Sequence, residues 1–235
     1  MPSSDRKKAT FGVVFLTIFL DMVGFSVIFP LFPAMLDYYL GKEELLGGGV
    51  LTIFVNSIQG FAFEGDSQNP SFRLETVIFG GILGSLYALL QFFFAPIWGR
   101  LSDRIGRRPV LLTTLFGTCI GYGLWIFAGD FWILVFSRIL SGVASGNLSV
   151  ATAAIADVTS RETRSKGMAF VGVAFGLGFV VGPALGGFAS QWSWDDNTSG
   201  IFQMTPFSLA ALISFCLAVI NILWLGYAFK ETLPE

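Results

Sequence analysis

The sequence contains no histidine, only two cysteines and few charged residues. Without histidine, neither a histidine-ligated metal site nor a histidine proton relay is possible. Both cysteines, Cys119 and Cys216, lie inside apolar runs, so we interpret them as small packing residues rather than a disulfide or metal ligands. We also find no nucleophile–base pair, metal-ligand cluster or nucleotide-binding loop. We therefore expect no enzyme activity, no cofactor, no metal site and no nucleic-acid partner.

Charged residues make up 13% of the 235 residues and apolar residues 54%, whereas soluble domains carry about 25% charged residues. The charges avoid six apolar stretches, each of roughly 20 residues or more, which is enough for a helix to cross about 30 Å of hydrocarbon. We predict an all-α polytopic membrane protein with one six-helix transmembrane domain. The predicted helices cover residues 11–36, 77–98, 109–128, 131–156, 165–189 and 205–229.

The lysines and arginines predict the orientation of these helices. Eleven of the fourteen fall at the two termini and in the second-to-third and fourth-to-fifth loops, whereas Lys42 and Arg73 fall on the opposite side. By the positive-inside rule both termini are cytoplasmic. The membrane is then a bacterial inner membrane or a eukaryotic cell membrane.

One connection, residues 37–76, is unusually long and lies on the outer side. Between Leu51 and Ala62 its apolar residues recur at helical spacing. This pattern predicts a short amphipathic helix at the outer interface. Such a helix either covers the outer ends of the bundle or acts as a gating lid.

The densest charge cluster is the segment Gly99–Arg108, which reads GRLSDRIGRR. Its four arginines cannot lie in hydrocarbon, so it is a short surface loop between neighbouring helices. Asp103 suits the positive N-terminal end of a helix, and Asp157, at the cytoplasmic end of the fourth helix, is a candidate partner for Arg107. Three arginines in this loop are candidates to bind acidic groups or lipid phosphates: Arg104, Arg107 and Arg108. The alternative is a set of basic residues that only fix topology.

Two ionisable residues lie inside predicted helices. Asp21 is about ten residues into the first helix, near 15 Å deep, and Arg138 lies inside the fourth. Ionisable groups at such depth face a cavity or each other, and a carboxylate that pairs in one state and takes a proton in another can couple transport to protons. The alternatives are a structural hydrogen bond for Asp21 and a fixed ion pair or carbonyl clamp for Arg138. Gln91 in the second helix either lines the cavity or bonds a neighbouring helix.

Small residues recur at four-residue spacing in two helices. They are Gly142 and Gly146 in the fourth helix and Gly178, Gly182, Gly186 and Gly187 in the fifth. Such faces let helix backbones approach closely, and Pro183 removes a backbone donor within the fifth helix. We predict tight helix packing with a bend.

Together these motifs resemble those of the major facilitator superfamily. The loop matches every position of the family signature Gly-x-Leu-(Ala/Ser)-Asp-Arg-x-Gly-Arg-(Arg/Lys). Its matching positions include Gly99, Asp103, Arg104, Gly106, Arg107 and Arg108. The first helix is similar to the Asp-x-x-Gly…Pro-x-x-Pro pattern of tetracycline-type drug:proton antiporters. The fourth-helix Arg-x-x-x-Gly-x-x-x-Gly pattern and the fifth-helix glycines also resemble family motifs, in the right order. The resemblance covers the chain except residues 37–76.

The resemblance implies the N-terminal six-helix half of a transporter, with nested three-helix repeats. The expected function is proton-coupled export of a small amphipathic organic solute or drug by alternating access. The alternatives are a symporter or uniporter, or a non-transporting membrane partner or receptor. In the family the loop network locks one state by tying the two halves together. The expected partners are lipid, solute, protons and a second half supplied by a homodimer, a separate subunit or a longer chain.

Overall fold

The computed structural model describes residues 4–61, 74–192 and 202–233. Within these residues the chain is helical, and six spans are long and apolar enough to cross a membrane. The described helices, in order, are α1 (Ser4–Ser26), a 3-10 turn η1 (Phe29–Leu31), α2 (Phe32–Leu45), α3 (Val50–Phe61), α4 (Leu74–Ile105), α5 (Arg107–Ile126), α6 (Phe131–Ala144), α7 (Asn147–Val158), α8 (Arg164–Ala189) and α9 (Ser208–Ala228). All but α3 contribute to the six spans. This is the all-α, six-span architecture that the distribution of charge predicts.

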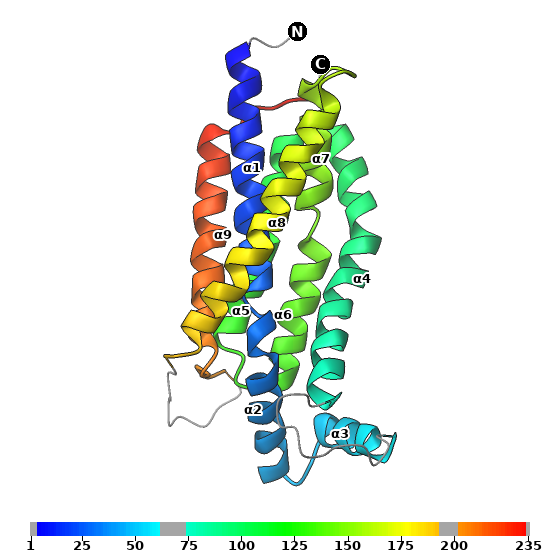
Figure 1. Ribbon diagram of the computed structural model, residues 1–235, viewed down its shortest axis with the longest axis vertical. Coiled ribbons are helices and arrows are strands. Elements are labelled where there is room, and N and C mark those ends of the chain that lie inside the picture. The colour runs from blue at the N-terminus through cyan, green and yellow to red at the C-terminus, as the bar shows by residue number, and fades with distance from the viewer. Residues whose placement is uncertain (1–3, 62–73, 193–201, 234–235) are drawn as a thin grey trace.

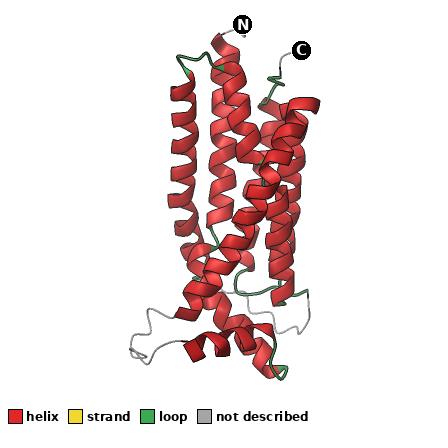
Figure 2. Cartoon of the chain, turned by 90° about the vertical axis from the view of Figure 1, so that its right-hand side faces the viewer, coloured by secondary structure: helices red, strands yellow, loops and turns green. Residues whose placement is uncertain are grey.

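The long helices form one bundle with both marked chain ends at the same end (Figure 1). Figure 2 shows the same bundle turned by 90°, with most of the described residues in helices. The interior contains two clusters of buried apolar side chains. One surrounds Trp125 and Leu134 near α2 and α3, and the other surrounds Ile18 and Leu111 toward the chain ends.

The six spans differ strongly in burial. More than half of the most apolar window is buried in the first, third and fourth spans, but only 22% in α4 and in α8. Large apolar side chains such as Phe92 and Phe93 of α4 and Val180 of α8 point away from the bundle. Helices α4 and α8 therefore offer most of their surface to lipid or to another protein.

Helices α1 and α8 pack closely because small residues line the contact. An added Cβ at Gly178 would lie 2.5 Å from the Met22 Cβ, and one at Gly186 would collide with the Val27 carbonyl oxygen. The Ser26 hydroxyl donates a hydrogen bond of 3.1 Å to the Gly178 carbonyl across this contact. Gly182 belongs to the same face, whereas an added Cβ at Gly187 would meet open space. Helix α8 continues through Pro183.

The fourth span is interrupted near its middle. The sequence predicts one helix over residues 131–156, but α6 ends at Ala144 and α7 begins at Asn147. Helix α4 approaches this break closely: an added Cβ at Gly146 would lie 2.5 Å from the Trp98 side chain. The Trp98 indole Nε1 donates a bond of 2.7 Å to the Val143 carbonyl. This satisfies one of the backbone acceptors that the break leaves without an intrahelical partner, as buried membrane helices require.

The long outer connection contains helix α3, which lies across the end of the bundle (Figure 1). Within the predicted amphipathic stripe, Leu51 and Val55 are buried against the core, while residues 62–73 lie outside the described part. Helix α2 is tied to the turn before α6 by the Tyr39 hydroxyl, which donates to the Ala128 carbonyl at 2.6 Å, and by Lys42, which donates to the Gly129 carbonyl at 2.7 Å. The described part of the connection, in α2 and α3, therefore packs over this end of the bundle.

Candidate functional site

The Asp21 carboxylate lies in the interior of the bundle, where the residue is 6% exposed. It accepts a hydrogen bond of 3.1 Å from the Asn147 Nδ2 atom. Asn147 is the first residue of α7, beside the break in the fourth span. The Asn147 Oδ1 atom in turn accepts a bond from the Thr114 hydroxyl of α5. Three spans therefore meet through one chain of polar contacts at the carboxylate.

A second polar contact joins α4 to the same break. The Ser145 hydroxyl oxygen accepts bonds from the Tyr87 hydroxyl at 2.6 Å and from the Gln91 Nε2 atom at 2.7 Å. Gln91 is half-buried, and it thus forms an interhelical hydrogen bond. The backbone on either side of the break is close-packed against α4, where an added Cβ at Gly142 would lie 3.0 Å from the Leu90 Cβ.

Arg138 lies on α6 and is 2% exposed. Its guanidinium carbon lies 4.6 Å from the centre of the Trp125 ring and 5.8 Å from that of Tyr122. The structure does not bring Arg138 and Asp21 together, because no hydrogen bond or ion pair joins them within the described residues. The two buried charges instead occupy separate surroundings: a polar one at Asp21 and an aromatic one at Arg138.

Aromatic side chains from α1, α4 and α8 pack together around Phe25. Phe25, one helical turn after Asp21, stacks on Tyr87 of α4 with ring centres 4.3 Å apart. It also meets Phe179 of α8 edge to face at 5.8 Å, and Phe175 stacks on Phe179 at 4.9 Å. Phe25 and Phe179 are half-buried and Phe175 is exposed. The result is an apolar wall beside a buried acid.

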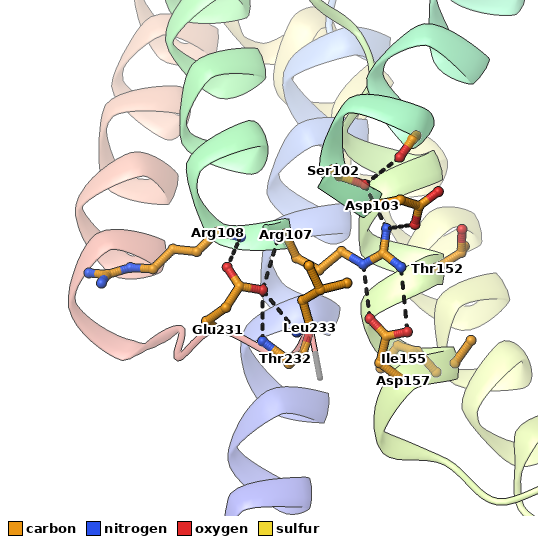
Figure 3. A network of polar contacts seen from close by, with 12 residues as sticks. Ser102, Asp103, Arg107, Arg108, Thr152, Ile155, Asp157, Glu231, Thr232 and Leu233 are labelled. Atoms are coloured by element: carbon orange, nitrogen blue, oxygen red, sulfur yellow. Dashed lines mark hydrogen bonds and ion pairs between the residues drawn. The ribbon is translucent and has the colours of Figure 1, made fainter. Parts of the chain in front are cut away.

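At the end of the bundle that carries the chain termini, Arg107 is the centre of a charge network (Figure 3). Its Nε atom lies 2.9 Å from the Asp157 Oδ2 atom, and its Nη1 atom lies 2.6 Å from Asp103 and 2.7 Å from the Ser102 hydroxyl. The Arg107 side chain is 6% exposed, compared with 17% for Asp157 and 61% for Asp103. The network therefore joins α4, α5 and α7 at one buried guanidinium.

Glu231 closes this network from the segment after α9 (Figure 3). Its carboxylate accepts bonds from the backbone N–H groups of Arg107 at 2.9 Å and Arg108 at 3.0 Å, at the start of α5. Gly106, with φ of +105°, precedes that helix, and an added Cβ there would collide with the Glu231 side chain. Burial opposes ionisation of Glu231, but the backbone bonds outweigh it and hold its pKa below the usual value. An anion at a helix N-terminus also complements the helix dipole.

The remaining loop residues lie at the surface or at close contacts. Arg104 is exposed and, with Ile97, Arg100 and Leu101, lines a shallow surface pocket. An added Cβ at Gly99 would lie 3.1 Å from the Ser149 hydroxyl, so this glycine lets α4 approach α7. Within the described residues, no group of three or more histidine, cysteine, aspartate or glutamate side chains is placed to hold a metal.

Several contributors to these clusters are absent from the sequence prediction, among them Tyr87, Ser145, Asn147 and Glu231. For Ser145 and Asn147, the only hint in the sequence is that both are polar residues next to Gly146 in the fourth span. Nothing in the local sequence links position 231 to a helix that starts 124 residues earlier.

Comparison with known proteins gives consistent matches. Residues 14–234 match the model of the Major Facilitator Superfamily. Major facilitator superfamily domain-containing protein 10 of Mus musculus is 36% identical over 234 residues, which cover all of this chain and 46% of that protein. Tetracycline resistance protein, class B, of Escherichia coli is 33% identical over 213 residues, which cover 91% of this chain and 42% of that protein.

A solved structure is also similar over the whole chain. The crystal structure of the human organic anion transporter MFSD10 superposes with a TM-score of 0.79 at 32% identity, covering all of this chain and 49% of that one. The chain thus spans about half the length of the relatives it matches. With its six spans, its ordered motifs and this match from end to end, the chain belongs to the Major Facilitator Superfamily.

Proposed function

We propose that this chain acts as one six-helix half of a secondary active transporter, exporting a small amphipathic organic solute in exchange for protons. The observation that carries the proposal is the Asp21 carboxylate, buried inside the bundle and held by one side-chain donor, Asn147. Ionisable groups within membrane helices are costly and mark ion or substrate pathways. Asn147 is the first residue of α7, directly after the break in the fourth span. A change in the charge of Asp21 would therefore act on the position of α7 relative to α6.

The chemistry proposed for the solute rests on the apolar wall of Phe25, Tyr87, Phe175 and Phe179 beside this acid. Aromatic faces bind apolar ring systems, while a few polar groups fix orientation. Among the relatives, one is described as an organic anion transporter and others as tetracycline resistance proteins. For this chain we propose an organic molecule with an apolar body and a few polar groups.

The second half is the proposed protein partner. Helices α4 and α8 leave most of their surface uncovered by this chain, which suits contact with a second bundle. Exposed Asp103 is free on its outer side to face a helix N-terminus of that bundle, while Arg107 and Asp157 hold the loop rigid from within. The partner is a second copy of this chain, a separate subunit or the C-terminal half of a longer chain. Both termini are proposed to be cytoplasmic, following the excess of basic residues there.

The test is solute flux in proteoliposomes with and without an imposed pH gradient. We expect wild-type flux to depend on the gradient and Asp21→Asn to abolish that dependence, because the amide keeps the bond to Asn147 but cannot exchange a proton. The matched control is Asp130→Asn, which alters the carboxylate that caps α6 by accepting from the Trp132 N–H at 2.8 Å. That change should leave the gradient dependence intact.

Each alternative has its own outcome in this experiment. Solute that moves in the same direction as protons indicates a symporter. Wild-type flux that does not depend on the pH gradient indicates a uniporter. Absence of flux with every solute and every assembled form would contradict transport and favour a non-transporting membrane protein. Equal gradient dependence in wild type and Asp21→Asn would exclude Asp21 as the coupling group.

A further inference from the structure

The break in the fourth span is a tight backbone turn centred on Ser145. Its φ of −74° and ψ of 66° are those of an inverse γ-turn, and the Gly146 N–H donates to the Ala144 carbonyl across the turn at 2.7 Å. Such a turn interrupts the helical hydrogen-bond ladder between α6 and α7. The position of α7 relative to α6 therefore depends on the contacts that hold Ser145.

Helix α4 holds this turn with two side chains that lie one helical turn apart. The Tyr87 hydroxyl donates to the Ser145 hydroxyl oxygen at 2.6 Å, and the Gln91 Nε2 atom donates to the same oxygen at 2.7 Å. Tyr87 is 2% exposed, so its bond is shielded from water and is stronger for it. The turn is thus tied to α4 through Ser145 and to Asp21 of α1 through Asn147.

Tyr87 also belongs to the apolar wall. Its ring stacks on Phe25 with ring centres 4.3 Å apart. Phe25 in turn meets Phe179, whose ring stacks on the exposed Phe175. Tyr87 therefore contacts the wall with its ring and the break with its hydroxyl. Because the phenol group is rigid, a displacement of the ring by a solute on the wall also displaces the hydroxyl that holds the turn.

We infer that Tyr87 is the positioning residue that couples occupancy of the apolar wall to the charge of Asp21. The path runs from the Phe25 ring through Tyr87 to Ser145. It continues through Asn147, two residues further on, to the carboxylate. A solute that moves the wall changes the turn and hence the bond to Asp21, and a proton on Asp21 changes the wall in return, because coupling between two sites is reciprocal. The inference deepens the proposed function and rests on it.

Asp21 is the group that titrates in this arrangement. Among the helices that pack on α1, α9 carries no charged residue. The charged residues of α7 and α8 all lie near the end of the bundle that carries the chain termini: Asp157, Arg164 and Lys166. The hydroxyls of Tyr87 and Tyr122 lie within electrostatic reach of Asp21, and Arg138 lies within reach of both tyrosines. Tyrosine hydroxyls keep their protons near neutral pH, so a pH response of the wall in that range is assigned to Asp21.

The test is a pH titration of a fluorescent label on the wall, in the full chain in nanodiscs. The label is acrylodan on the cysteine introduced by Phe175→Cys, at an exposed position of the wall. The exposed native cysteine is removed by Cys216→Ser, whereas Cys119 is buried. Acrylodan reports the polarity of its surroundings and does not itself titrate near neutral pH. We expect its emission to change with pH and Asp21→Asn to abolish that change, because the amide cannot take up a proton.

Two variants assign the path to Tyr87. Tyr87→Phe keeps the stacked ring and removes only the hydroxyl that holds Ser145, so we expect the amplitude of the pH response to fall by about twofold or more. Ser145→Ala removes the acceptor of the same bond and should act alike, and it decides the question if Tyr87→Phe does not fold. The matched control is Tyr39→Phe, which removes a buried hydroxyl that donates to the Ala128 carbonyl. That change should leave the amplitude unchanged.

A wild-type amplitude in the folded Tyr87→Phe and Ser145→Ala proteins would overturn the inference, even with a lower melting temperature, because the hydroxyl would then be only structural. A label that does not respond to pH in the otherwise wild-type chain would overturn it as well. Its failure is distinguishable from that of the proposed function. A pH response that requires both Asp21 and Tyr87, without flux of any solute, retains the path and contradicts transport. Gradient-driven flux with an unchanged response in Tyr87→Phe retains transport and contradicts the path.

Discussion

The two groups of charged residues in this molecule are built in opposite ways. In the network around Arg107, the guanidinium is shared between Asp157 and Asp103, and Glu231 accepts from backbone groups beside it. Inside the bundle, Asp21 and Arg138 are both buried, yet they do not pair with each other. One group neutralises its charges internally, and the other keeps them apart.

This difference separates structural from functional use of charge. A buried ion pair with good hydrogen bonds holds helices in one arrangement, and breaking it is costly. A buried charge without a countercharge lowers stability, and residues that break local rules in this way are expected at functional sites. The predictions below test whether the two groups respond to mutation as this contrast requires.

The largest expected effect is loss of stability when the Arg107 network is broken. Arg107→Gln removes both bonds to Asp157 and leaves that carboxylate, only 17% exposed, without its cation. We expect the free energy of unfolding to fall by about 3 kcal/mol, measured as a lower melting temperature of the detergent-solubilised protein. Arg104→Gln, an exposed position in the same loop, is the control and should change little. A melting temperature equal to wild type would show that the network does not hold the bundle.

Removal of the other buried arginine, Arg138, should raise the free energy of unfolding rather than lower it. Arg138→Met keeps most of the side-chain volume but removes the unpaired guanidinium, so we expect stability to rise by about 1–2 kcal/mol. The same thermal melting experiment measures it. A clear fall in melting temperature would mean that Arg138 is held by stabilising contacts like those of Arg107, and the contrast would fail.

The smallest expected effect concerns Glu231 and depends on pH. Its folded pKa lies below the unfolded value, which is about 4.3. Its contribution is therefore fully present above that pH and is lost as the pH falls through the folded pKa. Glu231→Gln should cost about 1 kcal/mol near pH 7, and the deficit against wild type should shrink in acid. Thermal melting near pH 7 and again in acid measures this deficit. The control is Glu44→Gln, at an exposed position. A deficit that does not change with pH would contradict an ionic role.

The sequence predicts the fold class well because the controlling physics is local. Charges are excluded from hydrocarbon, so the spacing of charged residues marks the six spans and the loop Gly99–Arg108 without any tertiary information. The contact between Arg107 and Asp157 is also suggested by sequence, since both fall at the same end of neighbouring spans.

The candidate site is only partly predictable. Depth along a helix can be counted from sequence, and it places Asp21 and Arg138 inside the membrane. The direction in which each side chain points depends on the rotation and tilt of its helix, which helix packing sets. The contact of Asp21 with Asn147 and the contact of Arg138 with Trp125 are therefore known only from the folded bundle. Glu231 is missed for the same reason, because its partners lie 123 and 124 residues away.

The sequence by itself determined that this protein is a six-span membrane domain with two buried charges and a basic loop at one surface. Those properties follow from the cost of transferring charge into hydrocarbon, which each residue incurs alone. Only the tertiary structure decided which charges are paired. Pairing depends on distances of about 3 Å between side chains of different helices, and these are fixed by close contacts such as Gly178 against Met22 and Gly146 against Trp98.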